Sequence, residues 1–137
     1  MIQEIINDIL TQLTGIEGVA TADAWQGDLK ELLKQPKKIP ALYAVYEGCT
    51  FGENQIVGGI QAPCNLDFLV LLIGGNLKGR AQAASTCYPF IEAVRSALTG
   101  HEVSPYGNLW PLREELVLAE GGILAYGLTY RMNNVIS

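Results

Sequence analysis

Apolar residues recur at helical spacing at the start of the chain and again in its second half. Residues 2–13 place isoleucine and leucine on one face of a helix, and Gly15 follows as a helix C-cap. A longer helix is predicted to begin near residue 77 or 78 and to run to residue 98, with Gly100 just past its end. Pro89 lies inside this pattern, so we expect a kink there or two helical pieces.

Four other stretches have the pattern of β-strands. Residues 39–46 and 64–73 are rich in β-branched and aromatic residues and are apolar on both faces, as in strands inside a sheet. Residues 109–119 and 123–132 form two further strands, and residues 120–122 are expected to connect them as a hairpin. In the last strand, two sets of side chains alternate between the faces of the sheet.

The remaining segments are shorter. A brief strand is expected at residues 19–22, and a short helix begins at Asp28 and ends before Pro36. Residues 48–63 contain four glycines and are expected to form a long loop or a projecting hairpin. This order predicts an α+β fold over residues 1–137, a single domain with a mostly antiparallel sheet and helices packed on one face.

Composition and charge exclude several classes of protein. The chain has 137 residues, 49% of them hydrophobic, but its longest apolar run, residues 68–73, is far too short to cross a membrane. The N-terminus lacks the basic residues of a signal peptide, so a cytosolic site is expected. The net charge is −5 and the nine lysines and arginines are scattered, which argues against specific nucleic-acid binding.

The cysteines and the single histidine indicate neither a metal site nor a disulfide framework. Cys49, Cys64 and Cys87 are odd in number and contain no CxxC pair, so we interpret them as small buried thiols. His101 follows the long helix and has no nucleophile motif near it in the sequence, which favours a surface histidine. We therefore expect no enzyme activity, no metal and no cofactor.

The glycine-rich turn Gly74–Arg80 is the nearest approach to a ligand site. Its glycines would let backbone amides approach an anion, and Lys78 and Arg80 would add positive charge. Neither nucleotide-binding signature, GxxxxGK[ST] or GxGxxG, is present. A tight turn between a strand and a helix requires the same glycines, so a ligand-binding turn and a purely structural turn both stay open.

Two pairs of residues are candidates for contact with other proteins. Glu114 and Glu115 are adjacent in a predicted strand, so their carboxylates point to opposite faces and suit a solvated edge or an interface better than acid–base catalysis. Phe51 and Trp110 lie in or beside predicted loops, where large aromatic residues either form interfaces or close the edge of a core.

Four stretches together resemble the Mu-type prophage tail proteins, a small family similar in architecture to the lambda-type tail terminators. These stretches span residues 40–132, about two-thirds of the chain: PALYAVYEG at 40–48, FLVLLIGGNLKGRAQA at 68–83, YPFIEAVRSALTG at 88–100, and LWPLREELV leading into ILAYGLTYRM up to 132. The order of the stretches carries the resemblance, because each one alone is a common pattern.

The resemblance implies a structural role in a virion rather than a chemical one. Such a protein would form a ring, commonly a hexamer, at the head-proximal end of the tail tube, with the tube protein and the head–tail connector as neighbours. It would occupy the host bacterial cytoplasm during assembly and then the virion tail. An acidic lumen would let DNA pass without sticking, and we expect the following residues to supply it: Asp67, Glu102, Glu114, Glu115 and Glu120.

The resemblance also directs attention to an assembly interface. Our candidates are the long loop and the strand that follows the long helix, represented by these residues: Phe51, Glu53, Asn54, Trp110, Glu114 and Glu115. Two other interpretations remain. The protein is either a head–tail connector or minor tail protein, or a small-ligand-binding module that uses the Gly74–Arg80 turn.

Overall fold

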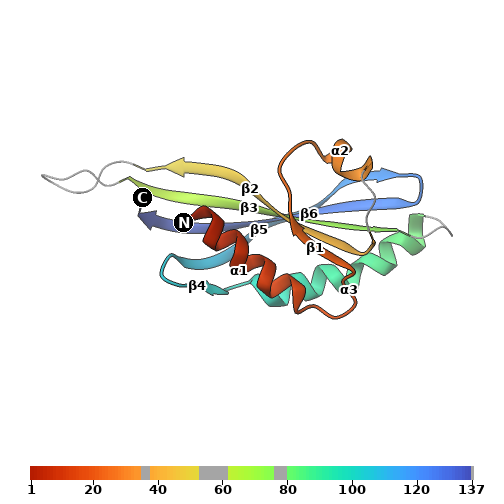
Figure 1. The fold of residues 1–137 in the computed structure, drawn as a ribbon, viewed down its shortest axis with the longest axis horizontal. Helices are drawn as coiled ribbons and strands as arrows, with labels where there is room; N and C mark the ends of the chain where they lie inside the picture. The colour runs from red at the N-terminus through yellow and green to blue at the C-terminus, as the bar shows by residue number, and fades with distance from the viewer. Residues whose placement is uncertain (35–37, 53–61, 76–79, 137) are drawn as a thin grey trace, which may run out of the picture.

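The computed structural model describes residues 1–34, 38–52, 62–75 and 80–136, and it shows a long twisted sheet with helices against it (Figure 1). The elements follow one another as α1 (Ile2–Thr14), β1 (Thr21–Ala24), α2 (Leu29–Lys34), β2 (Ala41–Phe51), β3 (Pro63–Gly75), α3 (Arg80–Leu98), β4 (Glu102–Val103), β5 (Gly107–Glu120) and β6 (Ile123–Ile136).

The strands are ordered β1-β2-β3-β6-β5-β4 across the sheet. The short β1 runs parallel to β2, and every other neighbouring pair is antiparallel. This arrangement confirms the α+β class and the mostly antiparallel sheet. The registers also join into rows that cross the sheet, for example Ala24, Ala44, Val70, Leu128 and Glu114 from β1 to β5.

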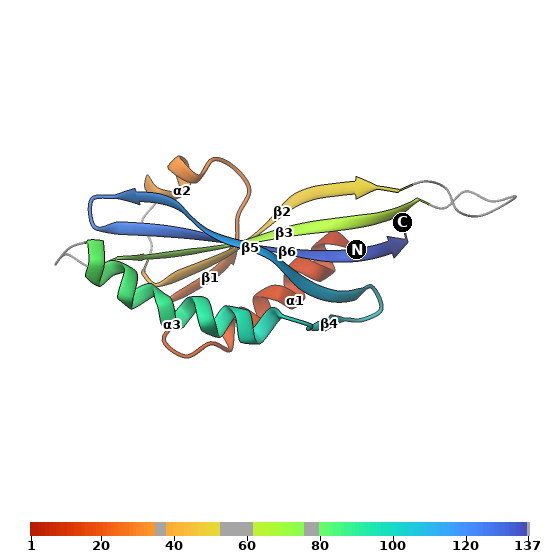
Figure 2. The same cartoon turned by 180° about the vertical axis from the view of Figure 1, so that it is seen from behind.

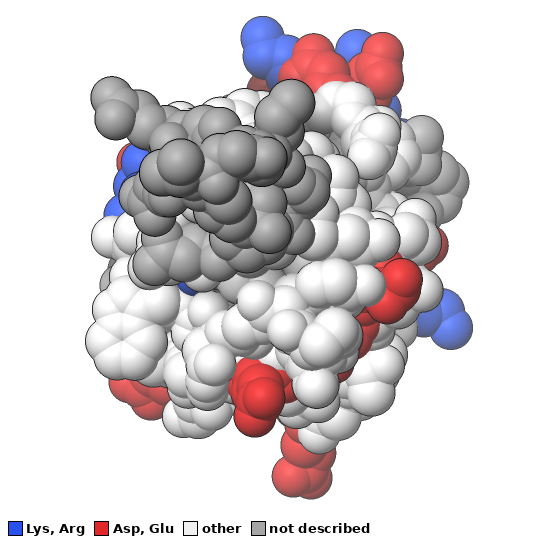
Figure 3. All heavy atoms as spheres, turned by 90° about the vertical axis from the view of Figure 1, so that its left-hand side faces the viewer, with Lys and Arg blue, Asp and Glu red and all other residues white. Residues whose placement is uncertain are grey.

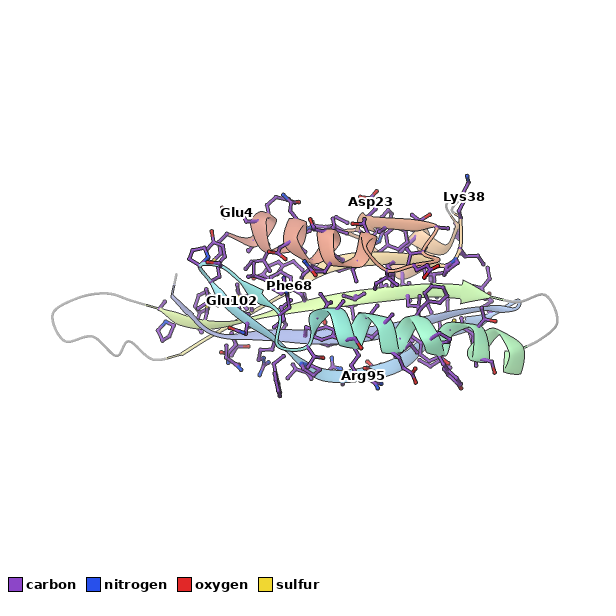
Figure 4. The ribbon with its side chains drawn as sticks, turned by 90° about the horizontal axis from the view of Figure 1, so that it is seen from below. Glu4, Asp23, Lys38, Phe68, Arg95 and Glu102 are labelled. Carbon is purple, nitrogen blue, oxygen red and sulfur yellow. The ribbon has the colours of Figure 1, made fainter. Side chains whose placement is uncertain are left out.

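One face of the sheet carries the main core. The two long helices α1 and α3 both lie across this face (Figure 4), and between helices and strands the buried side chains form one cluster. On α1 the apolar positions at helical spacing are the buried ones, Ile5, Ile6, Ile9 and Leu13. On β6 the alternate residues Leu124, Leu128, Tyr130 and Met132 join them. Phe68 at the centre is fully buried and packs against Tyr46, with ring centroids 5.6 Å apart.

The opposite face has a smaller apolar cluster under α2. Leu32 of α2 and the segment after β1 pack on Tyr43, Leu71, Ile73 and Ala125, so this helix lies on the other side of the sheet from α1 and α3 (Figures 1 and 2). The prediction of helices on one face therefore holds for the two long helices but not for the short one. A sheet whose central strands are apolar on both faces needs cover on both.

The boundaries of several elements differ from the prediction. The first strand is Thr21–Ala24 rather than residues 19–22, and the two-residue β4 was not expected. The helix α3 runs through Pro89 as one element, so the alternative of two helical pieces is wrong. The last strand continues past Met132 to Ile136, because β3 begins at Pro63 and gives it a partner over that length.

The predicted loop at residues 48–63 is partly made of strand. β2 continues to Phe51, and β3 begins at Pro63, so the two strands form the arms of a projecting hairpin. Within the described part of that segment, Gly52 N–H donates to the Pro63 carbonyl at 2.7 Å and closes the ladder. The projecting-hairpin alternative is thus the correct one for the arms, and the residues between them lie outside those described.

Candidate assembly surfaces

The strand β5 forms a long edge of the sheet. Its inner side pairs with β6 from Leu109 to Glu120, while β4 covers its outer side only at Gly107 and Asn108. The backbone of Leu109 is also used, because it accepts from the Gly100 amide at 2.8 Å and donates to the His101 carbonyl at 2.9 Å. Beyond that point, no strand among the described residues pairs with the outer side of β5.

This edge is also the most apolar exposed part of the described chain. Four of its large side chains are exposed, namely Trp110 (57%), Leu112 (44%), Leu116 (50%) and Val117 (38%). The register shifts twice, between Pro111 and Arg113 and between Leu116 and Leu118, so Leu112 and Val117 are extra residues at bulges. Bulges redirect side chains and interrupt the regular row of backbone groups through which an edge strand would otherwise pair with other chains.

Glu114 and Glu115 point to opposite faces of β5, as the sequence predicts, but neither is a free charge. Glu114 lies on the face covered by α3 and accepts two hydrogen bonds from Arg95, at 2.8 Å and 2.6 Å. The Arg95 hydrogen bonds hold the pKa of Glu114 below its ordinary value. Glu115 lies 3.5 Å from Arg113 of the same strand, in an exposed pair.

The remaining candidates from the sequence are not on this edge. Phe51 ends β2 and is 63% exposed, whereas Glu53 and Asn54 lie outside the described residues. β3 and β6 separate β2 from β5, so Phe51 and Trp110 belong to two different surfaces. The sequence missed Leu112 and Leu116, whose exposure follows from the position of β5 in the sheet and not from a local pattern.

The opposite edge of the sheet carries a hollow. β1 pairs with β2 only from Ala41 to Ala44, and beyond Ala44 the outer side of β2 has no strand partner among the described residues. At this step in the edge lies an open pocket of about 380 Å³. Its lining comes from α1, from the end of β1 with the two residues after it, and from β2. Polar and apolar atoms share the lining surface about equally, and the residues are these: Ile2, Gln3, Ile6, Ala24, Trp25, Gln26, Ala44 and Tyr46.

The acidic residues proposed for a lumen are partly neutralised. Asp67 accepts two hydrogen bonds from Arg131, at 2.7 Å and 3.0 Å, across the β3–β6 pair. Glu114 is paired with Arg95 in the same bidentate manner. Each of these two carboxylates has a guanidinium partner that the sequence alone did not reveal, and the acidic lumen stays a prediction.

The described glycines of the Gly74–Arg80 turn have structural reasons for being glycine. They lie within β3 rather than after it, and a Cβ on Gly74 would come 2.7 Å from Cys87 Sγ. A Cβ on Gly75 would come 2.7 Å from the Gly122 carbonyl oxygen. These close approaches explain both glycines without a ligand. Residues 76–79, which include Lys78, lie outside those described, so the phosphate-cradle alternative is untested there.

His101 holds α1 to the end of α3 rather than standing free on the surface. Its Nε2 lies 2.6 Å from Asp8 Oδ1, and both side chains are half-buried. Nearby, Tyr106 Oη donates to Glu4 at 2.7 Å, and this hydrogen bond lowers the pKa of Glu4. His101 follows the C-terminal end of α3, as predicted, but it is half-buried in a pair with Asp8, which is distant in the sequence.

The thiols lie where a core places them. Cys64 and Cys87 are buried, as expected, while Cys49 is half-buried, and all three are free. Burial, with Cys64 close by, raises the pKa of Cys49 to about 11. Among the described residues, no cluster of three histidine, cysteine or acidic side chains forms a metal site. Across the same residues, no helix is long and apolar enough to span a membrane.

These features define a small α+β domain with two sheet edges that are only partly paired. The described residues contain no cluster of metal-binding side chains. The family model of phage tail terminator proteins matches residues 1–137. The chain belongs to the phage tail terminator family and is a structural tail protein.

Comparison with solved structures agrees on the fold. One similar chain comes from the virion of a native gene transfer agent particle, with a TM-score of 0.56 and 21% sequence identity. The match covers 94% of this chain and 92% of the other. No individually curated protein sequence matches the chain.

Proposed function

We propose that the protein is a tail terminator that forms a ring, which we expect to be a hexamer, at the head-proximal end of the tail tube. The observation that carries this proposal is the family match over residues 1–137. The virion origin of the structurally similar chain supports a place in a particle. Assembly takes place in the host bacterial cytoplasm, and the finished ring stays in the virion tail.

The distribution of exposed groups supports a ring. A closed ring of identical copies needs two different surfaces on each copy, placed on opposite sides, so that each copy contacts the next by rotation. The apolar edge at β5 and the hollow beside β2 are such a pair, since they lie at opposite edges of one sheet. The role requires no catalytic group and no cofactor.

The neighbours along the tail axis are the tube protein and the head–tail connector. The end of the sheet formed by the β2–β3 hairpin is the surface we assign to one of them, with the exposed Phe51 as its described anchor. Seen from this end, the visible atoms around the hairpin are mainly uncharged and the acidic groups are scattered (Figure 3). A mainly uncharged end suits a protein partner better than DNA.

The test is deletion of this gene in the parent phage or prophage, followed by electron microscopy of the particles. A terminator predicts tails of variable and excessive length that lack heads, and restoration of normal particles by the gene in trans. Tails of normal length that fail to join heads would assign the protein to the connector instead. Normal infectious particles would refute a role in the virion.

A point variant tests the assigned surface. Phe51→Asp is expected to leave the protein folded, because the side chain is 63% exposed, but to prevent complementation of the deletion. The matched control is Ile123→Asp, which changes a 37% exposed residue at the other end of the sheet. Complementation by Phe51→Asp at the level of the control would remove Phe51 from the interface.

A further inference from the structure

The register places the two incomplete edges of the sheet at corresponding positions along the strand direction. The register places Ala44 of β2 in one row with Glu114 of β5, and Tyr46 of β2 in one row with Pro111 of β5. The hollow at the β2 edge is lined by Ala44 and Tyr46. The bulge residue Leu112 lies between Pro111 and Glu114, so it stands level with the hollow on the opposite edge of the sheet.

The two edges have complementary shapes, and both carry apolar side chains. Leu112 is an extra residue on an edge strand, and its apolar side chain is 44% exposed. Ile2, Ile6 and Tyr46 contribute aliphatic and aromatic side chains to the walls of the hollow. Its volume of about 380 Å³ is large enough to hold a leucine side chain. One edge therefore presents an exposed leucine, and the other a recess with apolar side chains in its walls and two glutamines, Gln3 and Gln26, in its lining.

Charge beside the contact is mixed. Arg113, next to Leu112, is 59% exposed and lies 3.5 Å from Glu115. Asp23 is an exposed residue of β1 whose carboxylate accepts from the Ala24 amide at 2.8 Å. The registers put Asp23 in one row with Glu115, so the contact rests on shape and apolar side chains rather than on ion pairs.

The direction of the strands fits the same contact. β2, β3, β6 and β5 are antiparallel in succession, so β5 runs opposite to β2. In a ring whose axis runs along the strands, rotation keeps each row at its height and brings β5 of one copy against β2 of the next. The strands at this junction are then antiparallel, like those within the sheet.

We propose that the ring closes by this contact: Leu112 of each copy inserts into the hollow between α1 and β2 of the next copy. The inference rests on the proposed ring-forming function and assigns its subunit interface. Leu112 is the central residue of the contact, because burial of a leucine side chain contributes enough to change association by roughly tenfold or more.

Cross-linking in assembled particles tests the contact directly. A chain carrying Arg113→Cys and Gln26→Cys places one thiol beside Leu112 and one on the rim of the recess, and leaves Leu112 itself unchanged. Treatment of purified tails with a short bis-maleimide should give a ladder of multimers that ends at a closed ring. The matched control, Arg113→Cys with Lys34→Cys on α2, should give no ladder beyond that of the parent protein, which keeps its three native cysteines. The same is expected of each chain that carries only one of the added cysteines.

A substitution provides a second measurement. Leu112→Glu is expected to keep the denaturation midpoint of the parent and to weaken ring formation roughly tenfold or more, whereas Ile123→Glu should complement normally. Absence of the ladder in tails that contain the protein, together with full complementation by Leu112→Glu, would overturn this interface and leave the terminator function standing. Normal tails in the gene deletion would overturn the function, and the interface with it.

Discussion

The strands β5 and β6 belong to one hairpin and have the same length, 14 residues each, yet their environments differ. β6 lies between β3 and β5 and buries residues on both faces, from Leu124 on the helical side to Ala125 on the other. Along β5 only Leu109 is fully buried, and most other side chains are exposed. Position in the sheet, and not hairpin membership or length, separates the two strands.

The difference indicates which strand supports the fold and which is available for contacts. A central strand gains from burial of both faces, so its residues determine the stability of the monomer. A long apolar edge strand is an aggregation hazard for a monomer unless it is shielded or has a partner. β5 carries Pro111, two bulges and four charged residues that limit uncontrolled pairing, yet it keeps exposed leucines.

The largest effect should come from the buried centre of the sheet. Phe68→Ala removes a fully buried ring that packs on Tyr46, and we expect a loss of about 3–5 kcal/mol in the free energy of unfolding. The matched change Phe51→Ala, at a 63% exposed position, should cost less than about 0.5 kcal/mol. Urea denaturation followed by circular dichroism measures both, and equal losses would contradict the division between centre and tip.

The next effect tests the close packing of α3 on β3. Gly74→Ala places a Cβ 2.7 Å from Cys87 Sγ, so we expect a loss of about 1–3 kcal/mol. In a Cys87→Ala background the same change should cost less, because the sulfur is gone. A double-mutant cycle by urea denaturation measures the coupling. Additive losses would show that the glycine is required for a reason other than this contact.

Local patterns were sufficient for the elements that bury their own apolar face. The isoleucines of α1 and the alternation in β6 predicted both the elements and the buried residues, because helical and strand periods select one face directly. The same reasoning failed for α2. Its short pattern does not indicate which side of the sheet it covers, and that choice depends on how β2 and β3 pair.

The surface was harder to predict than the core. Glu114 and Trp110 were named from the sequence as candidate contacts, but the Arg95 partner of Glu114 is 19 residues away and comes from another element. Leu112 and the hollow beside Tyr46 were not identified from the sequence. A bulge, or a place where a neighbouring strand ends, can be recognised only when the pairing of the strands is known. Long-range pairing, rather than local composition, produces these features.

A smaller difference in stability is expected between the ion pair of the central strands and the ion pair of the edge strand β5. Asp67→Asn removes the partner of Arg131 in a half-buried bidentate pair between central strands, and we expect a loss of about 1 kcal/mol. Glu115→Gln, in the exposed pair on β5, should change stability by less than about 0.5 kcal/mol. Urea midpoints of the two variants give the comparison, and a larger loss for Glu115→Gln would contradict it.

The smallest effect concerns the charged contact between Arg95 and Glu114, which links β5 to α3. Because the pKa of Glu114 is lower in the folded chain than its ordinary 4.5, the Arg95–Glu114 pair stabilises the fold above pH 4.5 and loses this effect as the pH falls through the folded pKa. Arg95 is half exposed, so the contribution should be below about 1 kcal/mol.

Thermal unfolding of the parent and of Glu114→Gln between pH 7 and pH 3 measures this contribution. The melting temperature of the parent should be higher by a constant small amount at neutral pH, and the two curves should converge below pH 4.5. Arg95→Gln serves as the control, because it should remove the same pH-dependent difference and add nothing when combined with Glu114→Gln. A difference that persists at pH 3 would show that Glu114 stabilises β5 by packing rather than by charge, and the edge would then be held to α3 independently of pH.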